Sequence, residues 1–133
     1  MRFIQETGFT ARPDKISALQ EWIVANRVRM AAAYPDGAMF LGAFVSVFSS
    51  EKGAGEVRIL EQLDSYGALD RLAALGKDPK SEYSMLFGEF LTFIDPSPTS
   101  GWSSSLLKDL VDATVWDMGA AETPEREPVA AGR

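Results

Sequence analysis

The stretch that decides the fold is residues 38–49, which read AMFLGAFVSVFS. Its alternate positions form two sets, and both sets are apolar. The sets are Met39, Leu41, Ala43, Val45 and Val47, and Ala38, Phe40, Gly42, Phe44, Ser46 and Phe48. A strand that is apolar on both faces needs cover on both sides. We therefore expect helices on one face and a second sheet, a partner subunit or a ligand on the other.

The segment that follows predicts a hairpin with this strand. After a loop with two glycines, residues 56–64 place Val57, Ile59 and Leu63 on one face. The alternate positions Arg58, Leu60 and Gln62 take the other face. Two such runs joined by a glycine-containing loop are typical of an antiparallel pair.

The remaining elements alternate between strands and helices. Residues 2–9 predict a short strand, and a long amphipathic helix that starts near Pro13 is expected to end near Ala33, before the turn signal YPDG. Two further helices are expected over residues 65–75 and 82–94. We favour a last strand over residues 106–118, strongest at 113–116, although the leucines of its first half also fit a helix. Residues 1–118 are thus one domain and 119–133 a tail.

Composition excludes several classes of function. The chain has 133 residues with 13 basic and 19 acidic side chains, so its net charge is −6, and a basic nucleic-acid footprint is not expected. It has no Cys and no His, which removes thiolate nucleophiles, imidazole bases and the usual ligands of transition metals. Scattered acids lack calcium-loop spacing, so we expect no metal. No signal peptide or membrane span is apparent, which predicts a cytoplasmic protein.

The order strand, long helix, hairpin, helices, strand is the ferredoxin-like β-α-β-β-α-β arrangement. Together with the two-faced apolar strand it resembles the dimeric α+β barrel superfamily, over residues 2–118 and without a specific motif. The resemblance implies a four-stranded antiparallel sheet and a homodimer whose eight strands surround a cavity. Some members are cofactor-independent monooxygenases and others degrade haem. The chain is most similar to a third group, small barrel proteins of polyketide and enediyne gene clusters that hold long apolar molecules.

Departures from the superfamily narrow these options. Haem-degrading members depend on an axial His, which this chain lacks. Monooxygenases of the superfamily commonly involve Asn, Trp and often His, but Asn26 is the only Asn here, and no spacing links it to Trp22, Trp102 or Trp116 in a family signature. We therefore predict no cofactor and assign no catalytic residue, and we treat the chain as a binding protein before an enzyme.

The candidate ligand site is the inward sheet face of the barrel. Its expected lining is Phe40, Phe44, Phe48, Leu60, Thr114 and Trp116, with Arg58, Gln62 and Thr114 as anchors for a polar head group and Phe87 and Phe90 of the third helix as a lid. The opposite face, with Met39 and Val45 inward, fits the periodicity equally well, and side chains alone would also fill the space. Trp102 is a candidate cap for the entrance.

Three functions remain open. The first is a carrier or scaffold for a long hydrophobic molecule, such as a polyene, a polyketide intermediate or a fatty acyl chain, in secondary metabolism. The second is a cofactor-independent monooxygenase or cyclase that positions an aromatic polyketide with Trp116, Asn26 and Arg58. In that case Glu6, Glu61 and Asp112 are candidates for an acid/base set, because burial among aromatic side chains raises the pKa of a carboxylate. The third is a ligand-free interaction module.

Overall fold

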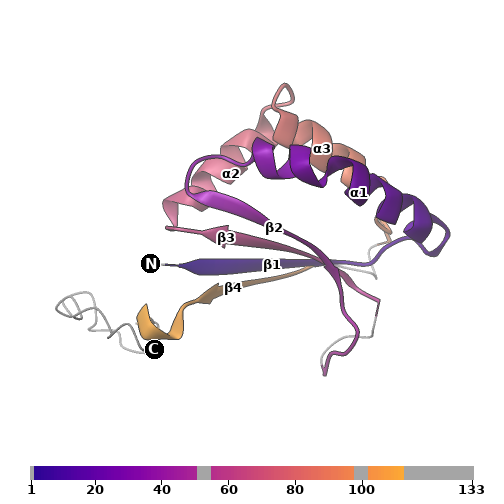
Figure 1. The fold of residues 1–133 in the computed structure, drawn as a ribbon, viewed down its shortest axis with the longest axis horizontal. Coiled ribbons are helices and arrows are strands. Elements are labelled where there is room, and N and C mark those ends of the chain that lie inside the picture. The colour runs from indigo at the N-terminus through magenta and orange to yellow at the C-terminus, as the bar shows by residue number, and fades with distance from the viewer. Residues whose placement is uncertain (1, 51–54, 98–101, 113–133) are drawn as a thin grey trace.

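Four antiparallel strands form one sheet in the order β2-β3-β1-β4, and three helices cover one of its faces (Figure 1). The computed structural model describes residues 2–50, 55–97 and 102–112. The strands are β1 (Phe3–Phe9), β2 (Ala38–Val45), β3 (Val57–Leu63) and β4 (Ser103–Lys108), and the helices are α1 (Ile16–Ala33), α2 (Gly67–Lys77) and α3 (Glu82–Leu91). The element order predicted a ferredoxin-like α+β fold, and the structure confirms this prediction.

Local sequence signals account for the helix ends. Pro13 opens a short 3-10 turn (Pro13–Lys15) that leads into α1. Tyr34, which precedes Pro35, is extended and ends α1 where the turn signal indicated. At α3, the Ser81 hydroxyl accepts a hydrogen bond from the Ser84 amide at 3.0 Å, which satisfies one of the free donors of the first turn.

A bulge in β2 changes which side chains share a face. Phe40 pairs with Glu61, but the register shifts before Gly42, which pairs with Leu60. Gly42 has a φ of +143°, a conformation that side-chain-bearing residues rarely adopt. The shift places Phe40 on the helix side of the sheet and Phe44 on the open side. The expectation that these two rings share a face is therefore wrong, because it assumed strict alternation along the strand.

The last strand lies earlier than predicted. β4 spans Ser103–Lys108 and begins with three serines, whereas the prediction began at Leu106. The chain then leaves the sheet in a 3-10 turn (Leu110–Asp112). β4 is an edge strand, and an edge strand tolerates polar residues because only one of its sides is paired. The prediction looked for apolar residues and therefore began the strand too late. The segment 113–116, where the strand signal was strongest, lies outside the described residues.

The core lies between the sheet and the helices in two clusters. Phe9, Ile59 and Phe90 belong to the first, with the ring centroids of the two phenylalanines 5.2 Å apart in an edge-to-face arrangement. Phe3 and Leu63 belong to the second, together with residues of α2. Full burial of each such side chain contributes about 1.5–3 kcal/mol relative to its exposure. Between the two clusters the helix face of the sheet is polar, and this interruption positions the site described below.

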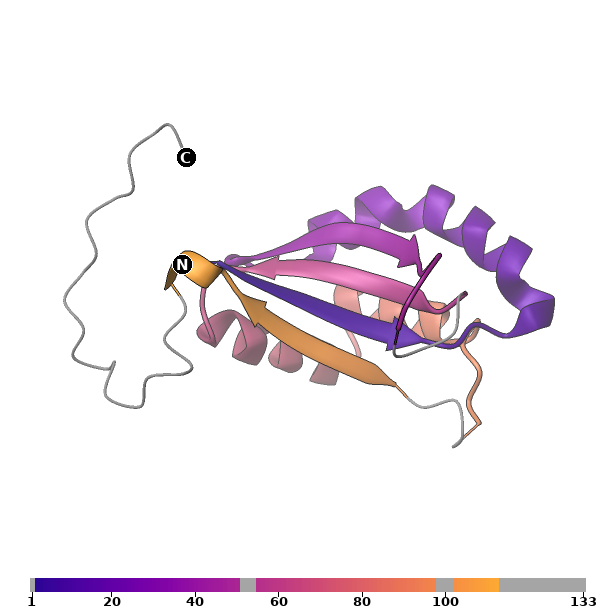
Figure 2. The same cartoon turned by 90° about the horizontal axis from the view of Figure 1, so that it is seen from below.

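In the part of the chain that the structure describes, no helix covers the opposite face of the sheet. Figure 2 shows the four strands from this side with the helices behind them. The strand pairing places Ile4, Met39, Phe44, Leu60 and Leu107 on this face. Met39, Phe44 and Leu107 are at least half exposed. The apolar pattern on both faces of β2 predicted that this face also needs cover.

Candidate functional site

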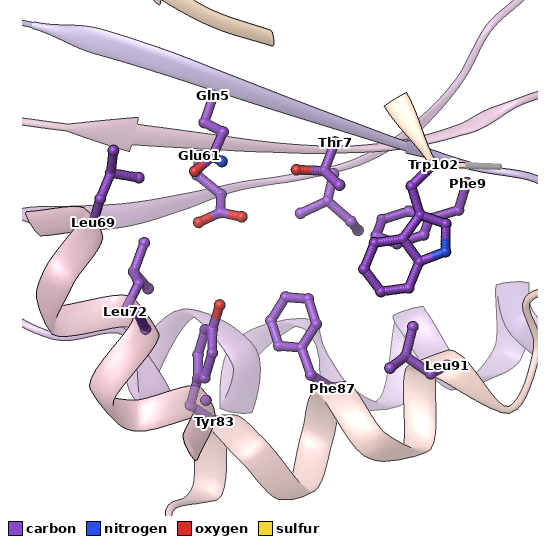
Figure 3. Close-up of a pocket in the computed structure, with 13 residues that line it drawn as sticks. Gln5, Thr7, Phe9, Glu61, Leu69, Leu72, Tyr83, Phe87, Leu91 and Trp102 are labelled. Carbon is purple, nitrogen blue, oxygen red and sulfur yellow. The ribbon is translucent and has the colours of Figure 1, made fainter. Parts of the chain in front are cut away.

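A cavity of about 350 Å³ lies between the helix face of the sheet and helices α2 and α3 (Figure 3). Strands β1 and β3 form its floor, and Trp102 lies at the end where β4 begins. The lining residues are Gln5, Thr7, Phe9, Ile59, Glu61, Leu69, Leu72, Ala73, Gly76, Tyr83, Phe87, Leu91 and Trp102. Most of this surface is apolar with a few polar groups, which is the usual character of a small-molecule pocket.

Polar residues on the floor keep the cavity open. β1 points Phe3 and Phe9 into the core, but the helix-facing positions between them are Gln5 and Thr7. Gln5 is the direct cross-strand neighbour of Glu61. Large apolar side chains at these two positions would pack against α2 and α3. Gln5 and Thr7 instead leave space between the sheet and these helices. Figure 3 shows that the Tyr83 and Phe87 side chains point from α3 toward these strands.

Glu61 is the distinctive group of the site. Its residue surface is only 5% exposed, and its Oε2 atom has no hydrogen-bond partner among the described residues. Burial raises the pKa of Glu61 from 4.5 to about 7, and the nearby Tyr34 hydroxyl opposes part of that rise. Near neutral pH this carboxyl is therefore divided between its acid and its base form, as a proton-transfer group requires.

Two tyrosines flank the Glu61 carboxyl. The Tyr34 ring lies 5.3 Å from the Tyr83 ring in an edge-to-face arrangement and stacks at 5.7 Å on Phe40. Burial, and then the Glu61 charge, raise the pKa of both hydroxyls above their usual value. Both tyrosines therefore remain protonated and available as donors at neutral pH.

Aromatic rings form much of the cavity wall. Tyr83 and Phe87 are tilted neighbours with centroids 4.6 Å apart. Phe9 and Trp102 meet edge to face at 5.2 Å, and Trp102 is 65% exposed. A planar, largely apolar molecule suits such walls because it can stack on one ring and meet the edge of another.

The charge balance of the lining restricts the ligand. Glu61 is the only charged residue among the thirteen that line the cavity. A buried carboxylate with no cation beside it repels a second negative charge strongly in a medium of low dielectric constant. The site therefore suits a neutral molecule that has a hydrogen-bond donor or an acidic proton.

The structure separates the residues that the sequence predicted as ligand contacts. Only Phe87 lines this cavity, while Phe90 is fully buried in the core beside it. Phe40 packs against the core on the helix side. Phe44, Arg58, Leu60 and Gln62 lie together on the open face, and Phe48 lies beyond the end of β2 with 86% of its surface exposed. Thr114 and Trp116 lie outside the described residues.

The polar residues proposed for anchoring and catalysis are also divided. Arg58 contacts Glu56, with Nε 3.2 Å from Oε1, and Glu6, with Nη1 3.8 Å from Oε2, on the open face. Glu6 and Glu61 are on opposite faces of the sheet, since Glu6 pairs with Leu60, so they do not form one acid/base set. Asn26 is engaged on α1, where its amide donates to the Trp22 carbonyl at 2.9 Å and accepts from Arg29 at 3.0 Å.

Sequence reasoning named Glu61 as a candidate acid or base, Phe87 as a lid residue and Trp102 as a candidate cap, but it missed the polar floor of the site. Gln5 and Thr7 were not singled out, because each is an ordinary residue in its strand. A usable signal was present in β3, where Glu61 interrupts the buried alternation of Val57, Ile59 and Leu63. Burial of a carboxyl group costs free energy. An acidic residue at a core position of a strand is therefore a candidate for a functional role.

Two other features of the described residues are negative. None of the helices in these ranges is long and apolar enough to cross a membrane. Within the same ranges, no group of three or more acidic side chains is placed to hold a metal ion.

Comparison with known proteins supports the fold alone. No protein-family model matches the chain, and no curated protein matches its sequence. Among solved structures, a NIPSNAP family protein from Agrobacterium tumefaciens superposes with a TM-score of 0.59 and 12% identity over 86% of this chain and 99% of that one. A NIPSNAP-like domain protein from Burkholderia xenovorans gives 0.59 and 12% over 84% and 88%. A putative antibiotic biosynthesis monooxygenase from Caulobacter crescentus gives 0.53 and 14% over 82% and 90%.

Proposed function

We propose that this chain binds a compact, largely apolar small molecule in the cavity between sheet and helices, and that Glu61 exchanges a proton with it. The observation that carries the proposal is the buried Glu61 carboxyl, which lines the cavity and has a pKa of about 7. A carboxyl group in a cleft whose pKa is strongly shifted by burial is a candidate functional group.

The chemistry follows from the ionised form of Glu61. The carboxylate removes a proton from an activated C–H or O–H bond of the ligand, the electron pair stays on the ligand as an enolate or phenolate, and Glu61 becomes protonated. Return of that proton to a different atom completes an isomerisation or prepares a cyclisation, with no net oxidation.

The cavity sets the size and charge of the ligand. Its volume of about 350 Å³ lies at the lower end of the range typical of ligand pockets, so one or two rings fit and a long polyene does not. The lone carboxylate disfavours acids such as free fatty acids. A neutral enolisable ketone with an aromatic ring meets both conditions.

A deuterium-exchange experiment tests this proposal with 2-tetralone, a neutral two-ring ketone whose α-protons are acidic. The wild-type chain should accelerate exchange in D₂O above buffer, and Glu61→Gln should lower the enzymatic rate by about 10²-fold or more, as loss of a general base does. Glu21→Gln, which removes an exposed carboxylate of α1, is the matched control. Equal rates for wild type and Glu61→Gln would exclude Glu61 as the base.

The open sheet face supports a second candidate, a homodimer that holds a longer apolar molecule between two sheets. Met39 and Phe44 are 55% and 50% exposed there, and an apolar surface of this kind is usually covered by a partner. Phe44→Asp places a charge on that face and should shift a dimer to monomer in sedimentation velocity. A wild-type monomer would refute this candidate, and extraction of a polyene or fatty acyl chain from the dimer would support the carrier role.

A further inference from the structure

Tyr34 lies close to Glu61. It follows the last turn of α1, and its ring stacks on Phe40, which is the direct cross-strand partner of Glu61 in β2. It also meets Tyr83, which lines the cavity, in an edge-to-face contact with the ring centroids 5.3 Å apart. Tyr34 itself is not among the lining residues. Two aromatic contacts thus hold the Tyr34 ring, and its hydroxyl interacts with the Glu61 carboxyl.

Two polar atoms in this region lack partners. Among the described residues, the Tyr34 hydroxyl oxygen and Glu61 Oε2 are both buried without a hydrogen bond of normal geometry. The groups are close enough to interact, since each alters the proton affinity of the other. The Tyr34 hydroxyl is a donor and the Glu61 carboxyl is an acceptor when ionised, and a buried polar group left without a partner is unfavourable. Hydrogen bonds in empty sites are often long or poorly aligned and tighten when a ligand binds.

We propose that Tyr34 is the positioning residue of Glu61: its hydroxyl donates to Oε2 of the ionised carboxylate from the side away from the cavity and so leaves the other oxygen to the ligand. The assignment rests on the proposed role of Glu61 as the proton acceptor of the site. Tyr34 does not touch the ligand in this arrangement. It fixes the direction in which the carboxylate meets the acidic proton.

The groups around Glu61 make Tyr34 the main support of its charged form. From α3 the titratable neighbour is Tyr83, from β1 the facing side chain is the neutral Gln5, and α2 contributes the apolar Leu69 and Leu72. No cation is among the described residues that line the cavity or that influence Glu61. A hydrogen-bond donor to a desolvated carboxylate therefore has a large effect on its proton affinity.

The test is the Glu61 titration in Tyr34→Phe, which removes the hydroxyl and keeps the ring contacts. The Glu61 side-chain carboxyl is followed by ¹³C NMR, with its signal assigned by its loss in Glu61→Gln. We expect the pKa of Glu61 to rise by about one unit in Tyr34→Phe, since a hydrogen bond to the charged form is lost. Tyr83→Phe is the matched control, because it also removes a neighbouring hydroxyl and ring contacts persist, and it should leave the value within about 0.3 unit.

An unchanged or lowered pKa in a folded Tyr34→Phe overturns the proposal, and so does an equal rise in Tyr83→Phe. If Tyr34→Phe does not fold, 3-fluorotyrosine incorporated into a Tyr66→Phe, Tyr83→Phe background gives the same test, because a more acidic phenol is a stronger donor and should lower the pKa of Glu61. No change there overturns it as well. These titrations need no ligand, so they are independent of the exchange experiment. A raised pKa of Glu61 in Tyr34→Phe together with a normal exchange rate in Glu61→Gln would support the pairing of Tyr34 with Glu61 and would exclude Glu61 as the base.

Discussion

The burial of Glu61 predicts a loss of stability as pH rises. The folded-state pKa is about 7 and the ordinary value is 4.5, so the native state holds a proton that the unfolded state has released over this interval. Stability therefore falls from pH 4.5 to pH 7, by about 3 kcal/mol in total at about 1.4 kcal/mol per unit. Roughly 2 kcal/mol of this loss falls between pH 5.5 and 8.5, a range that avoids the isoelectric region near 4.6.

Glu61→Gln removes the titration and keeps the size of the side chain. Urea denaturation gives the difference in the free energy of unfolding between Glu61→Gln and wild type. We expect this difference to shift by roughly 2 kcal/mol in favour of Glu61→Gln between pH 5.5 and pH 8.5. Glu21→Gln removes an exposed carboxylate from α1 and should follow the wild-type pH dependence. A constant difference between Glu61→Gln and wild type over the whole range would show that Glu61 ionises in the folded state as it does in the unfolded chain. The argument from burial would then fail.

Three further substitutions test the packing around the site. Phe90→Ala empties a fully buried position and should reduce the free energy of unfolding by about 3–5 kcal/mol, as followed by urea denaturation. Gly8→Ala brings a new methyl group against the Glu56 carboxylate and the Ser103 hydroxyl, so a loss of about 1–3 kcal/mol is expected, and an unchanged melting temperature would show that these side chains move aside. Ser81→Ala removes the helix cap of α3 and should cost about 1 kcal/mol by the same denaturation assay, with no loss expected if solvent replaces the cap.

Some of the fold was predictable because it depends on local chemistry. The helix ends at Pro13 and Tyr34 follow from the fixed geometry of proline and of the residue before it. The alternation of Val57, Ile59 and Leu63 correctly indicated the buried face of β3. The element order then led to the ferredoxin-like sheet because few topologies join these elements by short connections.

The candidate site was less predictable. Phe40 and Phe44 were expected on one face, and the bulge at Gly42 separates them, because a single extra residue reverses the alternation beyond it. A glycine in a strand is compatible with a bulge but does not locate one. The polar floor of Gln5 and Thr7 becomes a site only when α2 and α3 cover it.

The sequence by itself determined the types and order of the elements, the absence of Cys and His chemistry, and the apolar character of both faces of β2. Those properties depend on residues close together in the chain or on composition. The tertiary structure alone decided that α2 and α3 cover Glu61 across a cavity, that Tyr34 from the end of α1 comes close to it, and that Glu6 lies on the opposite face. The environment of an ionisable group is set by atoms distant in the chain, since burial and neighbouring charges fix its pKa.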